Sequence, residues 1–478
     1  MKNSHNIYKT NLSLLTDLYQ LTMAYGYWKT GIYNREAVFH LYFRRNPFGG
    51  QYTIASGLAP AIDYVQNLHF SEEDVAYLRT LKGVDEQRLL DDDFLDFLKD
   101  FCFECDIDAV TEGSFVFPNE PMMRVKGPLW QANLIETTLL NIINFSSLIT
   151  TKASRIVKAA QGDMVLEFGL RRAQGFDGGL TASRAAYIGG CYATSNVAAG
   201  QLYNIPVKGT HAHSWVMSWP NEMTAFEKMA EAMPHNAAFL VDTYNTIEGV
   251  KNVIQLSKNP DFQHVKIQSI RLDSGDLAPL SIEARRLLDE AGLTEVKIVA
   301  SNDLDEYAIE KLKKEGAKID IWGIGTKLVT AFDQPVLGGV YKLGAIKNEQ
   351  GEWAYKMKFS EEAVKASTPG FLQVRRVIEV SDNGNRIENI QDIIYDELDV
   401  DTLPEGENLL TPIFQNGALV YQTPDIQSIR NKSIENMKLF DEKILKSFRV
   451  SLDKKLILRK EKLQAALKED LKEIPSIS

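Results

Sequence analysis

The middle of the chain, from about residue 135 to residue 330, alternates short apolar runs with longer amphipathic segments. Two of these segments are typical helices: one carries Pro279 in its first turn, and another begins at Asn302 or Asp303 and ends at Gly316. Strand–helix alternation of this kind predicts a parallel sheet or an α/β barrel. The apolar runs expected to form its strands are Met164–Phe168, Ile205–Lys208, Ala238–Val241, Ile267–Leu272, Val296–Ala300 and Ile319–Trp322.

Glycine and polar residues follow these apolar runs. In a parallel α/β barrel the carboxyl ends of all strands meet at one rim, where enzymes of this architecture place their chemistry. Arginine and lysine side chains and glycine-rich turns bind phosphate groups, while carboxylates accept hydrogen bonds from sugar hydroxyls or bind Mg²⁺. The rim therefore predicts a site for a phosphorylated sugar. Its segments are Gly169–Arg172, Gly209–His213, Asp242–Thr243, Asp273–Asp276, Ser301–Asn302 and Gly323–Thr326.

Only two of the seven histidines, His211 and His213, lie at the end of an expected strand. A histidine that faces the same rim as several arginines is a candidate nucleophile or base. Side chains two residues apart in an extended chain point to the same side, so the spacing leaves the choice between His211 and His213 open.

Composition and short motifs exclude several other classes of protein. The formal net charge of −11 argues against a nucleic-acid partner. Three cysteines provide no disulfide framework, no P-loop motif is present, and Gly323-x-Gly325 lacks the third glycine of a dinucleotide-binding fingerprint. The sequence has no apolar run of about 18 residues and no signal-peptide pattern at its start. We therefore expect a cytoplasmic protein that binds neither nucleic acid nor a membrane.

The segments on either side of the strand–helix alternation have different patterns. A helix is expected over Leu18–Trp28 and a strand over Ala37–Phe43. After residue 335, Val336–Ile346 and Trp353–Phe359 are expected to form an antiparallel pair, and the charged stretch Ile429–Ser478 is typical of helix. These changes of pattern predict three domains, residues 1–134, 135–335 and 336–478.

Several long motifs resemble those of the nicotinate phosphoribosyltransferase family, and they occur in order over about residues 12–330. The motifs are TDLYQLTMAYGYW from Thr16, FRRNPFGGQYTIASGL from Phe43, LEFGLRRAQGFDGGLTASRAAYIGG from Leu166, GTHAHSW from Gly209, RLDSGDLAPLS from Arg271 and IWGIGTKLVT from Ile321. Their number and length make the resemblance specific.

The resemblance implies an enzyme that joins nicotinate to phosphoribosyl pyrophosphate and releases nicotinate mononucleotide and pyrophosphate, the first step of NAD salvage from nicotinate. It also implies Mg²⁺ and coupled ATP hydrolysis through a phosphohistidine, which places the enzyme among the ligases. The implied fold is an irregular α/β barrel of the type II phosphoribosyltransferase kind, with an N-terminal α+β domain and a C-terminal extension partly packed on that domain. The implied assembly is a homodimer whose active sites use both subunits.

The family motifs imply roles for individual residues but no metal ligands. The pattern G-T-x-A-H places the phosphorylated histidine at His213. The residues implied to bind nicotinate are Phe168, Arg271, Ser195, Asn196 and Tyr19 of the partner subunit. The residues implied to bind the phosphoribosyl group and the phosphates are Arg171, Asp273, Ser301, Asn302, Gly323, Gly325 and Thr326.

Three alternative functions predict other features in the sequence. A nicotinamide-using relative needs an acidic side chain to match the amide N–H, and such a side chain repels a carboxylate. The segment expected to face the ring substituent, Ala193–Val197, has no acidic residue, which favours nicotinate. A quinolinate-using enzyme would be a shorter chain without the N-terminal domain. A non-catalytic binding protein predicts the loss of a charged rim residue, but His213, Arg171, Arg271 and Asp273 are all present.

Overall fold

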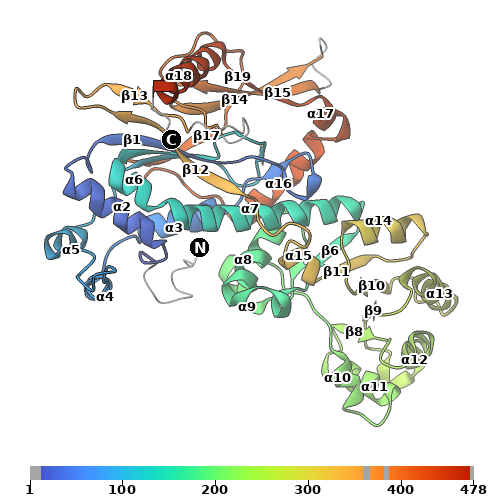
Figure 1. Cartoon of the computed structure of the whole chain (residues 1–478). Helices are drawn as coiled ribbons and strands as arrows, with labels where there is room; N and C mark the ends of the chain where they lie inside the picture. The colour runs from blue at the N-terminus through green and yellow to red at the C-terminus, as the bar shows by residue number, and fades with distance from the viewer. Residues whose placement is uncertain (1–11, 359–365, 382–386, 474–478) are drawn as a thin grey trace. The chain divides into compact units, whose positions relative to one another are not determined.

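The computed structural model describes residues 12–358, 366–381 and 387–473, and for residues 470–473 it describes the backbone only. The chain forms two compact units (Figure 1). The central unit is Ile149–Pro335, and the terminal unit combines Met1–Leu148 with Val336–Ser478. The two ends of the chain, expected as separate domains 1–134 and 336–478, therefore belong to one unit, which also contains residues 135–148.

The central unit is built on a six-stranded sheet in which all neighbouring strands are parallel, in the order β7-β6-β11-β10-β9-β8. The strands are β6 (Met164–Glu167), β7 (Ala193–Thr194), β8 (Ala237–Leu240), β9 (Ile267–Leu272), β10 (Lys297–Ser301) and β11 (Ile321–Ile324). This confirms the expected α/β class, and the irregular barrel is present as a half-barrel. Because the strands are parallel, their carboxyl ends lie along one edge of the sheet.

The strand expected at Ile205–Lys208 is not formed, so this prediction is wrong. Val207 makes only an isolated bridge to Thr194, and the short strand β7 occupies the edge of the sheet instead. Pro206 has no N–H to donate to a ladder. Backbone pairing here consists of the 3.0 Å bonds from Thr194 N to Pro206 O and from Lys208 N to Thr194 O.

The helices of the central unit begin where the sequence supplies a proline or a capping side chain. α13 (Leu277–Glu290) carries Pro279 in its first turn. α14 (Glu306–Lys314) begins after Asp305, later than expected, because the Asp305 carboxylate accepts a 2.8 Å hydrogen bond from Ala308 N. The other helices are α8 (Gly175–Ile188), α9 (Val197–Tyr203), α10 (His213–Met217), α11 (Glu222–Ala232), α12 (Thr246–Lys258) and α15 (Thr326–Val329). α7 (Glu136–Ala159) runs from the terminal unit into the central unit.

Most side chains of the central sheet are buried because they are apolar. Val165, Phe239, Ile270, Ile298 and Trp322 are each at most 2% exposed. Burial of a side chain of this size contributes ~1.5–3 kcal/mol. A shift of the register by one residue would turn these side chains to the opposite face, so the core fixes the register and the positions of the residues that follow each strand.

The terminal unit contains strands from both ends of the chain. Its seven-stranded antiparallel sheet has the order β13-β12-β1-β5-β3-β17-β18, and β1 (Glu36–Phe43) pairs with β12 (Gly339–Lys347). β1 and the antiparallel pair of β12 with β13 (Trp353–Tyr355) confirm the expected strands, while Phe359 lies outside the described residues. The sheet is completed by β3 (Asp106–Val110), β5 (Met123–Pro128), β17 (Leu410–Gln415) and β18 (Ala418–Leu419).

A second sheet of the terminal unit has the order β16-β14-β15-β19. Its strands are β14 (Leu372–Val380), β15 (Ile387–Asp396), β16 (Glu407–Asn408) and β19 (Arg449–Leu452). The carboxy-terminal stretch, expected to be helical throughout, therefore includes β19, which pairs in parallel with β15. Two short strands, β2 (Thr53–Ile54) and β4 (Phe115–Val116), form a separate ladder.

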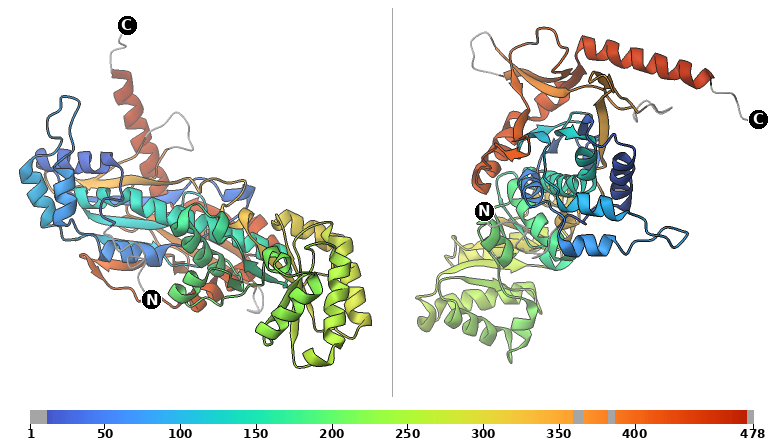
Figure 2. Two further views of the ribbon diagram at one scale, coloured as in Figure 1. Left: turned by 90° about the horizontal axis from the view of Figure 1, so that it is seen from below. Right: turned by 90° about the vertical axis from the view of Figure 1, so that its left-hand side faces the viewer.

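Helices flank these sheets of the terminal unit. α2 (Leu18–Lys29) confirms the helix expected near the start of the chain. The others are α3 (Leu58–Gln66), α4 (Glu72–Leu78), α5 (Asp92–Lys99), α6 (Leu129–Leu134), α16 (Ile426–Leu439), α17 (Glu442–Ser447) and α18 (Lys454–Glu473), the long red helix in Figure 2. In the described part of the chain, no helix is both long and apolar enough to cross a membrane.

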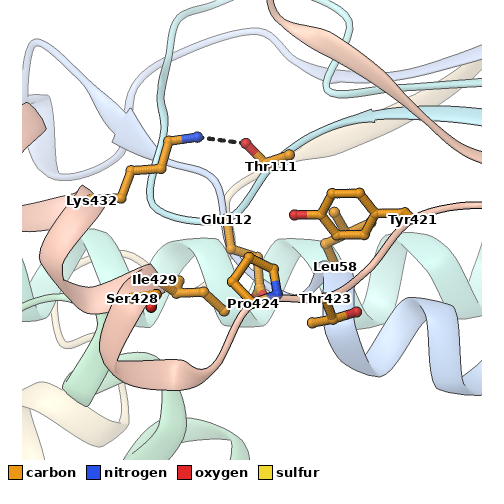
Figure 3. A pocket seen from close by; sticks show the side chains of 9 residues that line it. All are labelled: Leu58, Thr111, Glu112, Tyr421, Thr423, Pro424, Ser428, Ile429 and Lys432. Carbon is orange, nitrogen blue, oxygen red and sulfur yellow. Dashed lines mark hydrogen bonds between the residues drawn. The ribbon is translucent and has the colours of Figure 1, made fainter.

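A cavity of about 130 Å³ in the terminal unit is lined by residues from both ends of the chain (Figure 3). Leu58 of α3 and Ile429 of α16 contribute apolar walls. Lys432 Nζ donates a 2.5 Å hydrogen bond to Thr111 Oγ1, and burial lowers the pKa of Lys432. The side chains of the two chain ends therefore pack together, in agreement with the strand pairing.

His40 on β1 links two sheets of the terminal unit. Its side chain is 1% exposed, and Nε2 accepts a 3.2 Å hydrogen bond from the N–H of Leu372 at the start of β14. Burial and the positive charge of Arg124 lower the pKa of His40 from its ordinary value of 6.5 to about 3. The folded protein thus keeps the imidazole neutral, whereas the unfolded chain binds a proton below about pH 6.5.

Stability from His40 is therefore present above pH 6.5 and is lost as the pH falls toward 3. We expect His40→Gln, whose amide oxygen can also accept from Leu372 N–H, to reduce the acid dependence of the unfolding free energy by up to about 1.4 kcal/mol per pH unit between about pH 6 and pH 5. Urea titrations of the wild type and the variant at several pH values measure this difference. Equal slopes in that window would contradict a neutral buried imidazole.

Candidate active site

Phe168 lies directly after β6 and lines a cavity of about 240 Å³ in the central unit. Its N–H donates a 2.7 Å hydrogen bond to Ile324 O at the end of β11. A Cβ atom at Gly323 would lie 2.7 Å from Cδ2 of the Phe168 ring, so only glycine at this position leaves room for the ring. The guanidinium carbon of Arg271 is 5.7 Å from the ring centroid, within the range of a cation–π contact.

Arg271 is the centre of a hydrogen-bond network at the carboxyl ends of β9 and β10, which also includes Thr210 from the segment before α10. Its Nε donates to Ser301 Oγ at 2.7 Å, and one terminal nitrogen donates to Thr210 Oγ1 at 3.1 Å. The other terminal nitrogen donates to Asp273 Oδ1 at 2.8 Å, and Ser301 Oγ donates to the same oxygen at 2.5 Å. The network fixes a cation and a carboxylate side by side, each with capacity left for a ligand.

The environment of Asp273 keeps it ionised. Burial by itself raises the pKa of Asp273, but the hydrogen bond from Ser301 and the charge of Arg271 outweigh burial and leave the pKa below its ordinary value. Asp242 supports the turn, since its Oδ2 accepts from Asp273 N at 2.8 Å and from Ser274 Oγ at 2.6 Å. Asp273 can therefore act as a hydrogen-bond acceptor at neutral pH.

The structure gives His211 and His213 different surroundings. His211 Nε2 accepts a 3.2 Å hydrogen bond from Leu240 N at the end of β8, and burial lowers the pKa of His211. The side chain of His213 is 39% exposed; its Nδ1 lies 3.2 Å from Thr243 Oγ1, and its Nε2 lies 3.7 Å from Asp273 Oδ2. The His211 side chain is thus hydrogen-bonded to the backbone of β8, whereas the His213 side chain is accessible beside Asp273.

Ser195 and Asn196 follow β7, and their side chains are placed differently. The buried Asn196 side chain caps α9, with Oδ1 accepting from Ala199 N at 3.2 Å and Nδ2 donating to Ser183 Oγ at 3.2 Å. Ser195 is half-buried, and its N–H donates a 2.9 Å hydrogen bond to the carbonyl of Glu167. Asn196 therefore orders the segment, while Ser195 is the more accessible of the two.

The remaining expected site residues of the central unit lie in loops at the same sheet edge. Arg171 is exposed in a short 3₁₀ turn and makes no ion pair with any residue of the described ranges. Asn302 is exposed, and its Oδ1 accepts from Asp303 N at 2.9 Å. Gly325 and Thr326 form the start of α15, where the first backbone N–H groups have no partner within the helix. These loops offer a cation and free amides for phosphate groups.

Tyr19 belongs to the other unit, where it lies on α2 with 47% of its surface exposed. The central unit contains every other expected site residue, and direct contacts join five of them: Phe168, Arg271, Ser301, Asp273 and His213.

Several residues that support this cluster have no role predicted from the sequence. Glu167 is buried at the end of β6 and accepts three hydrogen bonds. Thr210 binds Arg271, and Asp305 forms a 2.8 Å ion pair with Lys327 beside the Gly325 loop. Glu167 and Thr210 lie within the family motifs, and Thr210 also lies in an expected rim segment, but no role is predicted for either residue. Asp305 has only the signal of a polar residue at the start of a helix.

Comparison with known proteins gives a consistent result. Models of the nicotinate phosphoribosyltransferase N-terminal domain and of the nicotinate phosphoribosyltransferase family match residues 14–144 and 164–366. A nicotinate phosphoribosyltransferase of Bacillus subtilis is 44% identical over 451 residues, which cover 90% of each chain. The chain belongs to the nicotinate phosphoribosyltransferase family. This confirms the resemblance of the motifs.

Solved structures support the same assignment. Human nicotinic acid phosphoribosyltransferase matches with a TM-score of 0.80 and 30% identity, over 94% of this chain and 99% of that one. A nicotinate-nucleotide pyrophosphorylase from Pyrococcus furiosus shares the fold, with a TM-score of 0.66 and 21% identity over 92% of this chain and 98% of that one. The fold expected of a nicotinate phosphoribosyltransferase is thereby confirmed.

Proposed function

We propose that the protein joins nicotinate to phosphoribosyl pyrophosphate, forming nicotinate mononucleotide and pyrophosphate, the first step of NAD salvage from nicotinate. One observation carries the proposal: the Phe168 ring lines the cavity, and the guanidinium carbon of Arg271 lies 5.7 Å from the centroid of that ring. An aromatic face beside a planar cation suits a pyridine ring that carries a carboxylate. Membership of the family supports this choice of substrate.

In this proposal the nicotinate ring stacks on Phe168, and its carboxylate binds Arg271. Ser195 contacts the ring substituent, and Asn196 acts with it by holding the segment through the cap of α9. The segment Ala193–Val197 has no acidic residue, so nothing there would repel a carboxylate or match an amide N–H. Nicotinate is therefore preferred over nicotinamide.

The phosphoribosyl group occupies the adjacent loops. Asp273 accepts hydrogen bonds from the ribose hydroxyls, with Ser301 and Asn302 on either side of the sugar. Gly323 of β11 and the backbone amides of Gly325 and Thr326 directly after this strand bind the 5′-phosphate, and Arg171 binds the pyrophosphate. The free capacity of Arg171 and of the loop amides supports these roles.

The chemistry is a displacement at C1 of the ribose. The bond from C1 to pyrophosphate breaks with its electron pair leaving on oxygen, and the ring nitrogen of nicotinate forms the new bond to C1. Positive charge develops on the sugar while negative charge develops on the leaving group. The residues therefore contribute by aligning the ring nitrogen and by stabilising charge, Asp273 near the sugar and Arg171 near the pyrophosphate.

The resemblance also implies Mg²⁺, and the carboxylates of the rim fit a substrate-bound ion. Among the described residues, no group of three or more His, Cys, Asp or Glu side chains is placed to hold a metal. Asp242 Oδ1 is buried without a hydrogen-bond partner and can accept from a water of the ion's shell. Mg²⁺ commonly keeps several waters and binds through phosphates with one or two carboxylates. When bound, it neutralises charge on the pyrophosphate.

ATP is proposed as a co-substrate that phosphorylates His213, which would make the enzyme a ligase and a phosphoprotein. The exposed ring of His213, with Nε2 3.7 Å from Asp273 Oδ2, supports this role. In the phosphorylation step a P–N bond forms on the imidazole as the γ-phosphoryl bond to ADP breaks, and water later cleaves the P–N bond. His211 is less suited, because its Nε2 accepts from the backbone.

Product formation with nicotinate or nicotinamide, phosphoribosyl pyrophosphate and Mg²⁺, each with and without ATP, tests the function. We expect nicotinate turnover that ATP stimulates. Turnover of nicotinamide in its place would show that Ser195 and its neighbours recognise an amide. Turnover of neither substrate would contradict the proposed enzyme.

His213→Ala is expected to abolish stimulation by ATP and to leave slow ATP-independent turnover, because the proposed phosphate acceptor is lost while the substrate site remains. The matched control is His211→Gln, whose amide oxygen can still accept from Leu240 N–H, and it should retain the stimulation. Initial rates with and without ATP, and acid-labile labelling from γ-labelled ATP, measure the effect. Full ATP coupling in His213→Ala would assign the phosphate to another residue.

We also propose a homodimer in which Tyr19 of the partner subunit covers the second face of the nicotinate ring. Tyr19 is exposed on α2, which supports a contact with the other subunit of the dimer. Mixing unfolded Tyr19→Ala and His213→Ala chains and refolding them should restore about one quarter of the ATP-coupled activity, since half of the dimers are mixed and each mixed dimer has one intact site. Absence of restoration, with mixed dimers shown by mass spectrometry, would contradict a shared site.

A further inference from the structure

Glu167 is the last residue of β6 and points away from the cavity. Met164, Leu166 and Phe168 line the cavity, and alternate residues of a strand face opposite sides of the sheet. The Glu167 side chain therefore lies on the other face, where it is 1% exposed and contacts Ser183 of α8. No described residue forms an ion pair with this buried carboxylate.

Three hydrogen bonds from different segments converge on the Glu167 carboxylate. Oε1 accepts a short bond from Gly169 N. Oε2 accepts from Ser183 Oγ at 2.8 Å and from Thr194 Oγ1 at 2.6 Å. All three donors are uncharged, and each of them has Glu167 as a buried acceptor. A smaller apolar residue would leave a cavity here and would take the acceptor away from all three donors.

The geometry of these bonds constrains the two residues proposed to meet the nicotinate ring. The bond from Gly169 N back to the Glu167 side chain closes a loop around Phe168. The Glu167 carbonyl accepts from Ser195 N at 2.9 Å, and Thr194 Oγ1 accepts from Asn196 N at 2.9 Å. The Glu167 side chain therefore binds the residue that follows Phe168 and the residue that precedes Ser195, so it links the two segments directly after β6 and β7.

We propose that Glu167 is a positioning residue that sets the spacing between the Phe168 ring and Ser195, and so shapes the site for the pyridine substrate. This proposal rests on the proposed function of the site. Glu167 does not touch the substrate; it acts through the residues that do. Stacking on Phe168 is present in both the ground state and the transition state, so a displaced ring raises KM for nicotinate and leaves kcat largely unchanged.

The first test compares Glu167→Ala with Glu167→Gln. We expect Glu167→Ala to raise KM for nicotinate about tenfold or more, with KM for phosphoribosyl pyrophosphate changed by less than about twofold. Glu167→Gln keeps an oxygen for Gly169 N–H and should restore KM to within about threefold of the wild type. The control is Glu306→Gln, a buried carboxylate of the same unit paired with Lys152 and Arg155, which should lower Tm without a selective change in KM.

If Glu167→Ala does not fold, a second pair of variants tests whether Glu167 positions the site. Thr194→Val has nearly the same shape as the native residue but lacks the hydroxyl that binds Glu167, whereas Thr194→Ser keeps it. We expect Thr194→Val to raise KM for nicotinate at least about threefold and Thr194→Ser to stay near the wild type.

Equal changes in both KM values, or unchanged KM for nicotinate in Glu167→Ala and Thr194→Val, would show that Glu167 serves stability alone. These results are distinguishable from a failure of the proposed function, because in that case the wild-type protein itself would not turn over nicotinate.

Discussion

The parallel pairing of β11 between β6 and β10 is the constraint on which the candidate site depends. Gly323 of β11 pairs with Ser301 on one side and with Leu166 on the other. Because parallel strands end at the same edge of the sheet, residues that are far apart in sequence arrive next to one another. Because glycine has no side chain, Gly323 leaves space for the ring of Phe168.

The charged groups at this edge are ordered before any ligand binds. Arg271 is held by Ser301, Thr210 and Asp273, and Asp273 is held in turn by the backbone bond to Asp242. The loss of side-chain freedom therefore occurs during folding, so that less binding energy is spent on it later. Such a fixed arrangement also stabilises developing charge without reorganisation.

The sequence predicts those elements whose signal is local. The apolar runs of β6, β8, β9, β10 and β11 place each strand to within two residues, and the motifs identify the family.

Contacts between residues that are far apart in the chain produce no local sequence pattern. The prediction fails at Ile205–Lys208, where Pro206 prevents a regular ladder. Spacing along an extended chain leaves His211 and His213 equivalent and only the family motif selects His213, whereas in the structure the bond from Leu240 N to His211 gives the two side chains different surroundings. Glu167 is missed because its partners come from three segments. Likewise, no local pattern shows that β1 pairs with β12, so the two ends of the chain appear as separate domains.

The pairing of β1 with β12 also has a consequence for the order in which the protein forms on the ribosome. The central unit is continuous, and its residues are complete once Pro335 has emerged. The terminal unit is discontinuous in sequence. β1 cannot pair with β12, nor β3 with β17 near residue 410, until the later strand of each pair has been synthesised. During synthesis the open edges of β1 and β3 therefore remain without their final partners while the whole central unit is made. Nascent chains of this protein carry unpaired strand edges for longer than the arrangement of a single continuous domain would require.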